Sequence, residues 1–345
     1  MRNSFVTLRE ARNLAQKKIR NGTFQWLESG AEDNFTSELN LSDLNKIKII
    51  PKNFNSIGSN NFNFKFFNKK IENPFIIAPM GHQTQFHPKG ELEVAKGMNS
   101  ANIIGAFTTQ GRHSFDQIKN KYKNINAIWQ IFPFGDLDWI ERQIKLAEKN
   151  NAIAISICLD APSRSHRYDD RETGYDARKF GKNYNKIKNN PNYFFNYDWS
   201  LIKKIKKMTL LPVIPKGIMS KEDLNSALKN GADGLWISNH GGRFFNSGIS
   251  TVSFLNSIQK ELKKIKNKKI IIVDGGVRRG SDIIKYLCMG ADIIAVGRPF
   301  LYGLISYGSL GVQNIYSILS SEFYNNCNNG GFKKIEDFNI TRISI

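Results

Sequence analysis

Eight short runs of apolar and β-branched residues recur along the chain, and they constrain its fold more than any other feature. Helical patterns separate one run from the next. The runs are continuously apolar, which is expected when both faces of a parallel sheet are buried. Eight strands that alternate with helices predict an α/β fold, a closed (β/α)8 or TIM barrel. The runs are 74–81, 102–110, 126–133, 152–162, 211–219, 232–242, 268–277 and 291–299.

The segments around these runs predict how the barrel is completed. Apolar residues in 137–149 have the spacing of one helix face, and Ser220 has the position of an N-cap for another helix. We expect residues 1–73 to form a helical and hairpin extension and residues 74–345 to form the barrel domain. A long polar stretch after the fourth strand predicts a loop, and such long loops are usually functional.

The bulk composition narrows the class of protein. The 345-residue chain has a net charge of +20 and a pI of about 9.7, so a nucleic-acid partner must be weighed. Its lysines are scattered among asparagine and isoleucine without a zinc-finger, helix-turn-helix or RNP pattern, which favours a solvated basic surface. No apolar run is long enough to span a membrane, and the three cysteines are far apart. Because the first residues are charged and lack an apolar run, we expect no secretory leader. We expect a cytoplasmic protein with no membrane or nucleic-acid partner and no metal site.

Charged residues stand at the carboxyl ends of the predicted strands, where barrels build their active sites. The sixth run ends in SNHGGR, with His240 and Arg243, and the fifth contains Lys216. Histidine takes a proton near neutral pH, arginine binds a carboxylate with two parallel hydrogen bonds, and Asp160 could hold the imidazole. A polar turn with a structural histidine is the alternative, but the joint placement of these residues favours catalysis.

Glycine and arginine follow the last two strands, in DGGVRRG and GRP. Glycine lets backbone N–H groups approach a phosphate, and arginine adds positive charge. Barrels commonly bind phosphate after strands seven and eight. Gly276, Arg278, Gly297 and Arg298 therefore predict a phosphate site; the alternative is a pair of turns with surface arginines.

The motifs together resemble those of the FMN-dependent L-2-hydroxy acid oxidases and dehydrogenases. This family includes glycolate oxidase, lactate oxidase, mandelate dehydrogenase and the flavin domain of the lactate cytochrome reductase. The resemblance extends from FQWLESGAED through IIAPMG, QIF, LDAP, PKGI, SNHGGR and DGGVRRG to GADIIAVGRPFLYGL, and it is most similar to the lactate oxidases. It implies FMN as the cofactor, a small 2-hydroxy acid as the substrate, oxygen or another electron acceptor, and a homotetramer.

The resemblance also implies roles at the substrate. His240 would be the base that takes the hydroxyl proton of the substrate, and Asp160 would stabilise the resulting imidazolium. Arg243 and Arg167 would bind the substrate carboxylate, with Arg164 as the other candidate in the long loop.

A second set of residues would hold FMN by the same resemblance. Lys216 would lie at the N1/O2 edge of the flavin, where negative charge develops on reduction, and Asp274 would hold the ribityl chain. The remaining implied contacts are Pro79, Met80 and Gly81 near N5, Thr108, Gln130, Cys158 and Ser238 at the ring, and Gly276, Arg278, Gly297 and Arg298 at the phosphate.

Four positions depart from the family pattern. Trp26 and Phe132 stand where the family usually has two tyrosines whose hydroxyls reach the substrate. Losing a hydrogen-bond donor to a buried oxygen costs about 1–3 kcal/mol. Cys158 replaces a threonine or serine, and Gly81 replaces an alanine, which predicts more room beside the flavin N5.

These departures leave three hypotheses. The first is oxidation of a lactate-like or glycolate-like L-2-hydroxy acid. The second is an FMN enzyme for a larger substrate, such as an aromatic hydroxy acid or a modified peptide. The third is a flavin-binding or nucleic-acid-binding scaffold without catalysis, against which the intact His240 and Asp160 argue.

Overall fold

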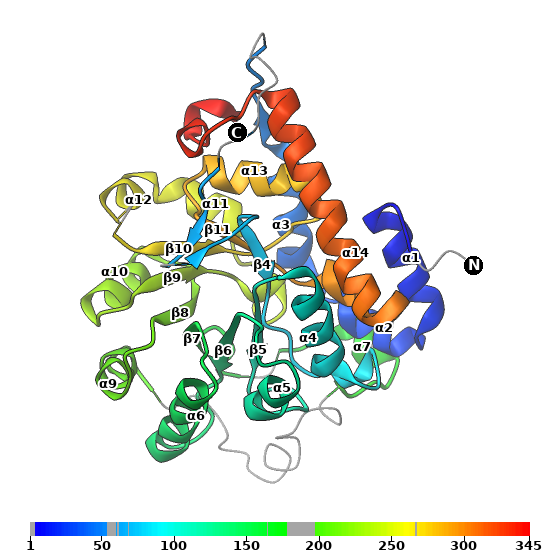
Figure 1. The fold of residues 1–345 in the computed structure, drawn as a ribbon, viewed down its shortest axis with the longest axis vertical. Helices are drawn as coiled ribbons and strands as arrows, with labels where there is room; N and C mark the ends of the chain where they lie inside the picture. The colour runs from blue at the N-terminus through cyan, green and yellow to red at the C-terminus, as the bar shows by residue number, and fades with distance from the viewer. Residues whose placement is uncertain are drawn as a thin grey trace.

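The structure is a computed structural model that describes residues 4–53, 60, 62–67, 69–163, 165–177, 197–265 and 268–345 (Figure 1). Its eight central strands are β4 (Phe75–Ile77), β5 (Gly105–Thr108), β6 (Ala127–Ile131), β7 (Ala154–Cys158), β8 (Val213–Ile218), β9 (Gly234–Ile237), β10 (Ile270–Val273) and β11 (Ile293–Val296). They pair in parallel in this order, and β11 pairs with β4 to close the barrel. The predicted TIM barrel is therefore confirmed, with every predicted run forming a strand.

Both faces of these strands are buried, which explains why the runs are continuously apolar. One face packs against the surrounding helices in the main hydrophobic cluster. The other face fills the barrel interior, where Phe66 from the extension joins it. The interior side chains are Ile76, Ala106, Ile128, Ala154, Ile214, Trp236, Ile272 and Ala295.

Helices connect the strands as the sequence predicts. The Ser220 hydroxyl accepts a hydrogen bond from the backbone N–H of Asp223 at 3.0 Å, which confirms the predicted N-cap. The helices after β4 are α4 (Gly90–Ala101), α5 (Phe115–Lys121), α6 (Leu137–Lys149), α7 (Tyr168–Glu172), α9 (Ser200–Met208), α10 (Lys221–Lys229), α11 (Thr251–Ser257), α12 (Gln259–Ile265), α13 (Gly280–Cys288) and α14 (Arg298–Gly330). Short 3-10 turns are η1 (Gln83–Gln85), η3 (His240–Gly242), η4 (Ile335–Asp337) and η5 (Ile340–Arg342).

The N-terminal extension has the predicted helices and hairpin. Its elements are α1 (Leu8–Lys18), α2 (Asn21–Glu28), α3 (Phe35–Lys46), β1 (Lys48–Ile49) and the antiparallel pair of β2 (Lys65–Phe66) with β3 (Lys69–Lys70). Figure 1 shows α1 beside the long α14, and β1 pairs with β12 (Ile343–Ser344) near the other end of the chain. The domain boundary at residue 73 stays a prediction.

The extension also reaches the carboxyl ends of the strands. The side chains of Asn40 in α3 and Asn239 after β9 exchange hydrogen bonds of 2.9 Å. The backbone N–H of Ala31 donates to the Gly242 carbonyl at 2.7 Å. The segment after α2 therefore lies against the turn that carries the predicted base.

The long loop after β7 contains α7 at its start. Its backbone forms an isolated parallel bridge between Arg167 and Glu32 of the extension. Arg164 and residues 178–196 of this loop lie outside the described residues.

Candidate active site

The carboxyl ends of the barrel strands surround a cavity of about 920 Å³. Three predicted site residues lie behind its wall: Asp160 and Ser238 bond to wall residues, and Cys158 bonds to Asp160. One cavity therefore brings together the predicted base, carboxylate clamp and cofactor residues. The predicted residues in the wall are Trp26, Pro79, Met80, Gly81, Thr108, Gln130, Phe132, Arg167, Lys216, His240, Arg243, Asp274, Gly276, Arg278, Gly297 and Arg298.

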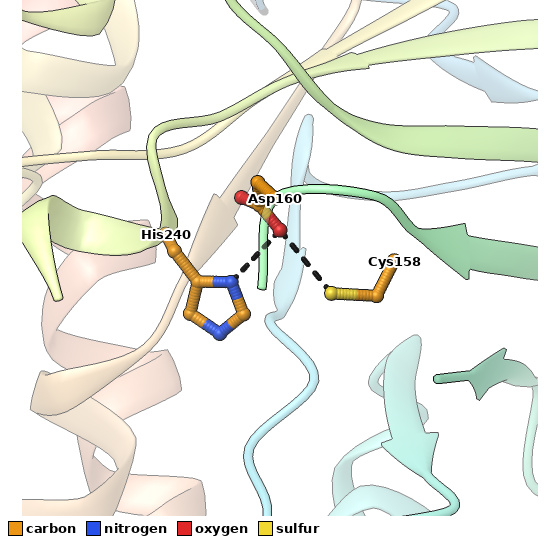
Figure 2. Close-up of side chains that lie close together, drawn as sticks. All are labelled: Cys158, Asp160 and His240. Atoms are coloured by element: carbon orange, nitrogen blue, oxygen red, sulfur yellow. Dashed lines mark hydrogen bonds and ion pairs between the residues drawn. The ribbon is translucent and has the colours of Figure 1, made fainter. Parts of the chain in front are cut away.

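His240 and Asp160 form a hydrogen-bonded pair after β9 and β7 (Figure 2). The Nδ1 of His240 lies 2.9 Å from the Oδ1 of Asp160, and the His240 backbone N–H donates to the Ser238 hydroxyl at 3.0 Å. His240 has a φ of 56°, in the left-handed region that costs a non-glycine residue energy and recurs at functional sites. Because Asp160 occupies Nδ1, Nε2 is the ring nitrogen available to a substrate, and it points away from Asp160.

The surroundings of this pair favour a neutral imidazole next to an ionised carboxylate. Burial lowers the pKa of His240, and Asp160 opposes this effect only in part. Burial also opposes ionisation of Asp160, but Lys216 and His240 hold the pKa of this carboxyl well below its usual range. The imidazole can therefore accept a proton at neutral pH, and Asp160 can stabilise the imidazolium.

Lys216, from β8, links this pair to the cofactor side of the cavity. Its ammonium donates to the Ser238 hydroxyl at 2.7 Å and lies 3.7 Å from Asp160 and 3.6 Å from Asp274. Asp274 in turn accepts from Ser238 at 2.8 Å and from the Trp236 indole at 2.9 Å. Burial opposes the charge of Lys216, but the two carboxylates raise its pKa, so it is an ammonium. A positive charge therefore lies at this wall of the cavity, and its place beside the flavin stays a prediction.

The two predicted clamp arginines both lie against the ring of Trp26. The guanidinium carbon is 4.5 Å from the ring centre for Arg243 and 5.1 Å for Arg167, which is within cation–π range. Arg243 also donates to the backbone carbonyls of Trp26, Leu27 and Ser29 at 2.8, 3.1 and 2.8 Å. These bonds fix the guanidinium and leave its Nε hydrogen and one Nη2 hydrogen for a ligand.

The N-terminal extension and α7 hold Arg167. Its side chain pairs with Asp170 at 3.3 Å, and its backbone bridges to Glu32. The pair with Asp170 uses Nη2, and a guanidinium has further donors on Nε and Nη1. The structure therefore brings Arg167, as well as Arg243, to the wall of the cavity.

The two arginines of the predicted phosphate site differ in their hydrogen bonds. Arg298 already donates from Nε to the Leu27 carbonyl at 3.1 Å, and from Nη2 to Ser29, Ser37 and Gly241 at 3.4, 3.2 and 3.3 Å. A phosphate would have to use its Nη1. Its neighbour in the prediction, Arg278, is bonded through Nη1 to the preceding carbonyl at 2.9 Å.

Glycine is required at the predicted phosphate site. Gly275 and Gly276 have φ values of 112° and 75°, which side chains rarely adopt. A Cβ on Gly276 would also lie 2.4 Å from the Asn40 carbonyl oxygen. The turn therefore requires glycine, because Asn40 packs against it, and the approach of its backbone to a phosphate stays a prediction.

The prediction of extra room beside Gly81 is wrong. A Cβ at Gly81 would lie 2.9 Å from the Cβ of Gln110 and 3.3 Å from its carbonyl oxygen, so Gln110 fills the space. Nearby, the Gln130 amide nitrogen is buried and has no hydrogen-bond partner among the described residues. A buried donor of this kind is costly unless a ligand satisfies it.

Two predicted ring contacts lie farther from the cavity than expected. Cys158 is fully buried, and its thiol donates to the Asp160 Oδ1 at 3.2 Å instead of lining the cavity. The fully buried Ser238 hydroxyl is bonded to Lys216 and Asp274. The side chains of both residues therefore contact other site residues instead of the cavity.

Sequence reasoning missed an aromatic wall around the base. The ring centroids of Phe132 and Phe134 are 5.6 Å apart, and those of His240 and Phe244 are 4.6 Å apart. Phe132 also meets His240 edge-on at 6.1 Å. Phe134 and Phe244 stand within two residues of predicted site residues, so a search of the motif flanks would have found them.

His82 is a second residue that sequence reasoning missed. It lines the cavity directly after Gly81, and its ring meets Trp26 edge-on at 6.1 Å. Burial lowers the pKa of His82 to about 4, so it is neutral at neutral pH. It therefore adds a polar but uncharged group beside the two arginines.

Comparison with known proteins decides the family. The model of the FMN-dependent dehydrogenase family matches residues 15–344. The chain belongs to this family. A 2-hydroxyacid oxidase of Dictyostelium discoideum is 28% identical over 349 residues, covering 97% of this chain and 89% of the relative. An L-lactate oxidase of Lysinibacillus sphaericus is 28% identical, covering 89% and 84%. A crystal structure of a mandelate oxidase superposes with a TM-score of 0.89 at 25% identity, covering 99% and 98%.

Family membership gives FMN as the cofactor and 2-hydroxy acid oxidation as the reaction. The cavity fits this cofactor, because it combines the orphaned Gln130 amide, the Lys216 ammonium and the tight glycine turn at Gly276. Among the described residues, no helix has the length and apolar character needed to cross a membrane.

Proposed function

We propose that this FMN-dependent family member oxidises a lactate-like or glycolate-like L-2-hydroxy acid to the 2-oxo acid. Oxygen would be the electron acceptor and would leave as hydrogen peroxide. The observation that carries the proposal is the neutral His240, held by Asp160 in a cavity that also holds Arg167 and Arg243. Oxidation of an alcohol carbon needs a base for the hydroxyl proton and a fixed orientation of the carbon.

The chain's own residues would divide the work as follows. Arg167 and Arg243 would bind the carboxylate and orient the substrate. The Nε2 of His240 would then take the hydroxyl proton, and Asp160 would stabilise the imidazolium through its bond to Nδ1. FMN supplies the acceptor for the hydride equivalent from the substrate carbon. The Lys216 ammonium would offset negative charge on the cofactor side.

Anaerobic bleaching of the bound flavin tests this proposal. L-lactate, glycolate and longer L-2-hydroxy acids would be added one at a time to the purified protein with FMN bound. Bleaching by the L acid but not its D isomer, followed by recovery in air with hydrogen peroxide release, is the expected result. If the bleached flavin does not recover in air but does recover with an artificial electron acceptor, oxygen is refuted as the acceptor.

The His240→Ala variant tests the role of the base. It should bind FMN with an unchanged absorbance spectrum and should not bleach with the substrate. His240 is one of many residues that line the cavity, so we expect the variant to keep its flavin. A variant that bleaches at the wild-type rate would remove His240 from its role.

A second candidate substrate class is an aromatic 2-hydroxy acid. The observation that favours it is the set of Phe132, Phe134 and Phe244 around His240, which offers ring faces and edges to an aromatic side chain. Trp26 and Phe132 in place of tyrosines also make this end of the cavity less polar. A lower KM for L-mandelate or L-phenyllactate than for L-lactate would support this class, and the reverse order would exclude it.

Three further proposals concern the setting of the enzyme. We propose a homotetramer in the cytoplasm, by analogy with the family, and sedimentation of the FMN-loaded protein would test the assembly. A scaffold that binds nucleic acid through its positive charge is a weaker alternative. Steeply salt-dependent binding of DNA or RNA at the protein concentration of the assays would favour it.

A further inference from the structure

A buried thiol shares the oxygen by which Asp160 holds the base. The Sγ of Cys158 lies 3.2 Å from the Oδ1 of Asp160, and the Nδ1 of His240 lies 2.9 Å from the same atom (Figure 2). The Oδ2 of Asp160 has no hydrogen-bond partner within the described part of the chain, and it lies 3.7 Å from the Lys216 ammonium. The two donors therefore share one carboxylate oxygen.

The thiol is the donor in this contact. Burial raises the pKa of Cys158 well above its ordinary value, and Asp160 adds to the effect, so the sulfur keeps its proton. Asp160 is ionised and can only accept. A donor to Oδ1 stabilises the carboxylate and draws electron density away from the bond to His240.

We propose that Cys158 is a positioning residue that weakens the hold of Asp160 on the His240 imidazolium and so keeps the base neutral at lower pH. This rests on the proposed role of His240 as the base. The charged groups that act on His240 are Asp160 after β7, Lys216 on β8 and Asp274 after β10, and Cys158 modifies the first of them. The rings of Phe132 and Phe244 also contact the His240 ring.

The same three side chains have the residue types of a zinc site. Ligand atoms of Cys158, Asp160 and His240 lie within 4.8 Å of one another. A cation there would meet the Lys216 ammonium 3.7 Å from Asp160, and the buried thiol would have to lose its proton. These two observations favour the hydrogen-bonding role over metal binding.

A matched pair of variants isolates the donor. Cys158→Ser and Cys158→Ala have nearly the same size, but only serine donates to Asp160. The readout is the pH dependence of the anaerobic rate at which the 2-hydroxy acid bleaches the bound FMN, measured with EDTA and with zinc sulfate.

At low pH the rate should fall because His240 becomes protonated. We expect this acidic limb to lie at higher pH for the alanine variant than for the serine variant. A net hydrogen bond of about 1 kcal/mol corresponds to roughly a fivefold slower rate for the alanine variant at pH values below its acidic limb. On the plateau the rates should be similar. Coincident limbs for the two variants would show that Cys158 only fills space. A wild-type profile that depends on added zinc would also overturn the proposal.

A second readout separates this proposal from the proposed reaction. Nitrogen-15 NMR of labelled histidine follows the titration of His240 without any substrate, and His240→Asn assigns its signal among the five histidines. The imidazole should titrate at higher pH in the alanine variant than in the serine variant. If no 2-hydroxy acid bleaches the flavin, the proposed function fails, but this titration still tests Cys158. Identical titrations would refute its role.

Discussion

Asp160→Asn is the perturbation that tests the electrostatic design of the site most directly. The asparagine keeps the shape of the side chain and can still accept the Nδ1 hydrogen of His240, but it removes the negative charge. That charge lies 2.9 Å from the His240 ring nitrogen and 3.7 Å from the Lys216 ammonium. The variant therefore separates charge from geometry.

The distances set the size of the effect. Unit charges about 3–4 Å apart interact by about 4–6 kcal/mol at an effective dielectric constant of about 20. Because the amide retains part of the hydrogen bond, we expect a loss of about 3–4 kcal/mol in the stabilisation of the imidazolium. Each 1.4 kcal/mol is tenfold in rate, so flavin reduction should slow about 100- to 1000-fold.

Anaerobic stopped-flow bleaching, at saturating substrate on the pH plateau, measures this rate. The FMN content of each preparation and the absorbance spectrum of its bound flavin control for loss of cofactor. Since Asp160 opposes the lowering of the His240 pKa, the acidic limb should also move to lower pH in the variant. A variant that reduces flavin within tenfold of the wild type would refute the assignment of Asp160 as the charge that stabilises the imidazolium.

Three further changes have defined outcomes. Arg243→Lys loses the planar fork that holds three carbonyls, so the KM of the acid should rise roughly ten- to hundredfold with FMN content unchanged; an unchanged KM would contradict the clamp. Phe132→Tyr adds a hydroxyl near the base and should raise kcat/KM for L-lactate about fivefold, as one net hydrogen bond allows. His82 has a folded pKa of about 4 against an ordinary 6.5, so its contribution to stability is complete above pH 6.5 and is lost as the pH falls toward 4. Urea unfolding gives the free energy of unfolding at pH 7 and at pH 5. Between these pH values, it should fall by about 2 kcal/mol less for His82→Gln than for the wild type.

The barrel could be predicted from the sequence because each strand is marked locally. Parallel strands with two buried faces give continuous apolar runs, and the runs at 74–81 and 291–299 pair to close the sheet. The helix after Ser220 carries its own N-cap. The packing of α1 against α14 depends on contacts between chain ends, which local patterns do not contain.

The candidate site was predictable where the residues at the strand ends carry the chemistry. It was less predictable where residues from other strands decide how much space there is or where a side chain points. His240 and Lys216 follow from their strands. The space beside Gly81 depends on Gln110, which follows the next strand. The absence of a side chain at Gly81 therefore could not reveal that Gln110 fills this space. Cys158 contacts Asp160 because its side chain points behind the cavity wall, and the sequence does not fix that direction.

The end of α2 shows how the N-terminal extension contributes to the candidate active site. The carbonyl of Leu27 accepts bonds from both Arg243 and Arg298, at 3.1 Å each, and the carbonyl of Ser29 accepts from both at 2.8 and 3.4 Å. Carbonyls at the carboxyl end of a helix lack partners within the helix and attract cations. The helix end therefore holds Arg243, the proposed substrate arginine, and Arg298, the proposed phosphate arginine, in one arrangement. A barrel without residues 21–29 would keep His240 but lose the acceptors that position its clamp.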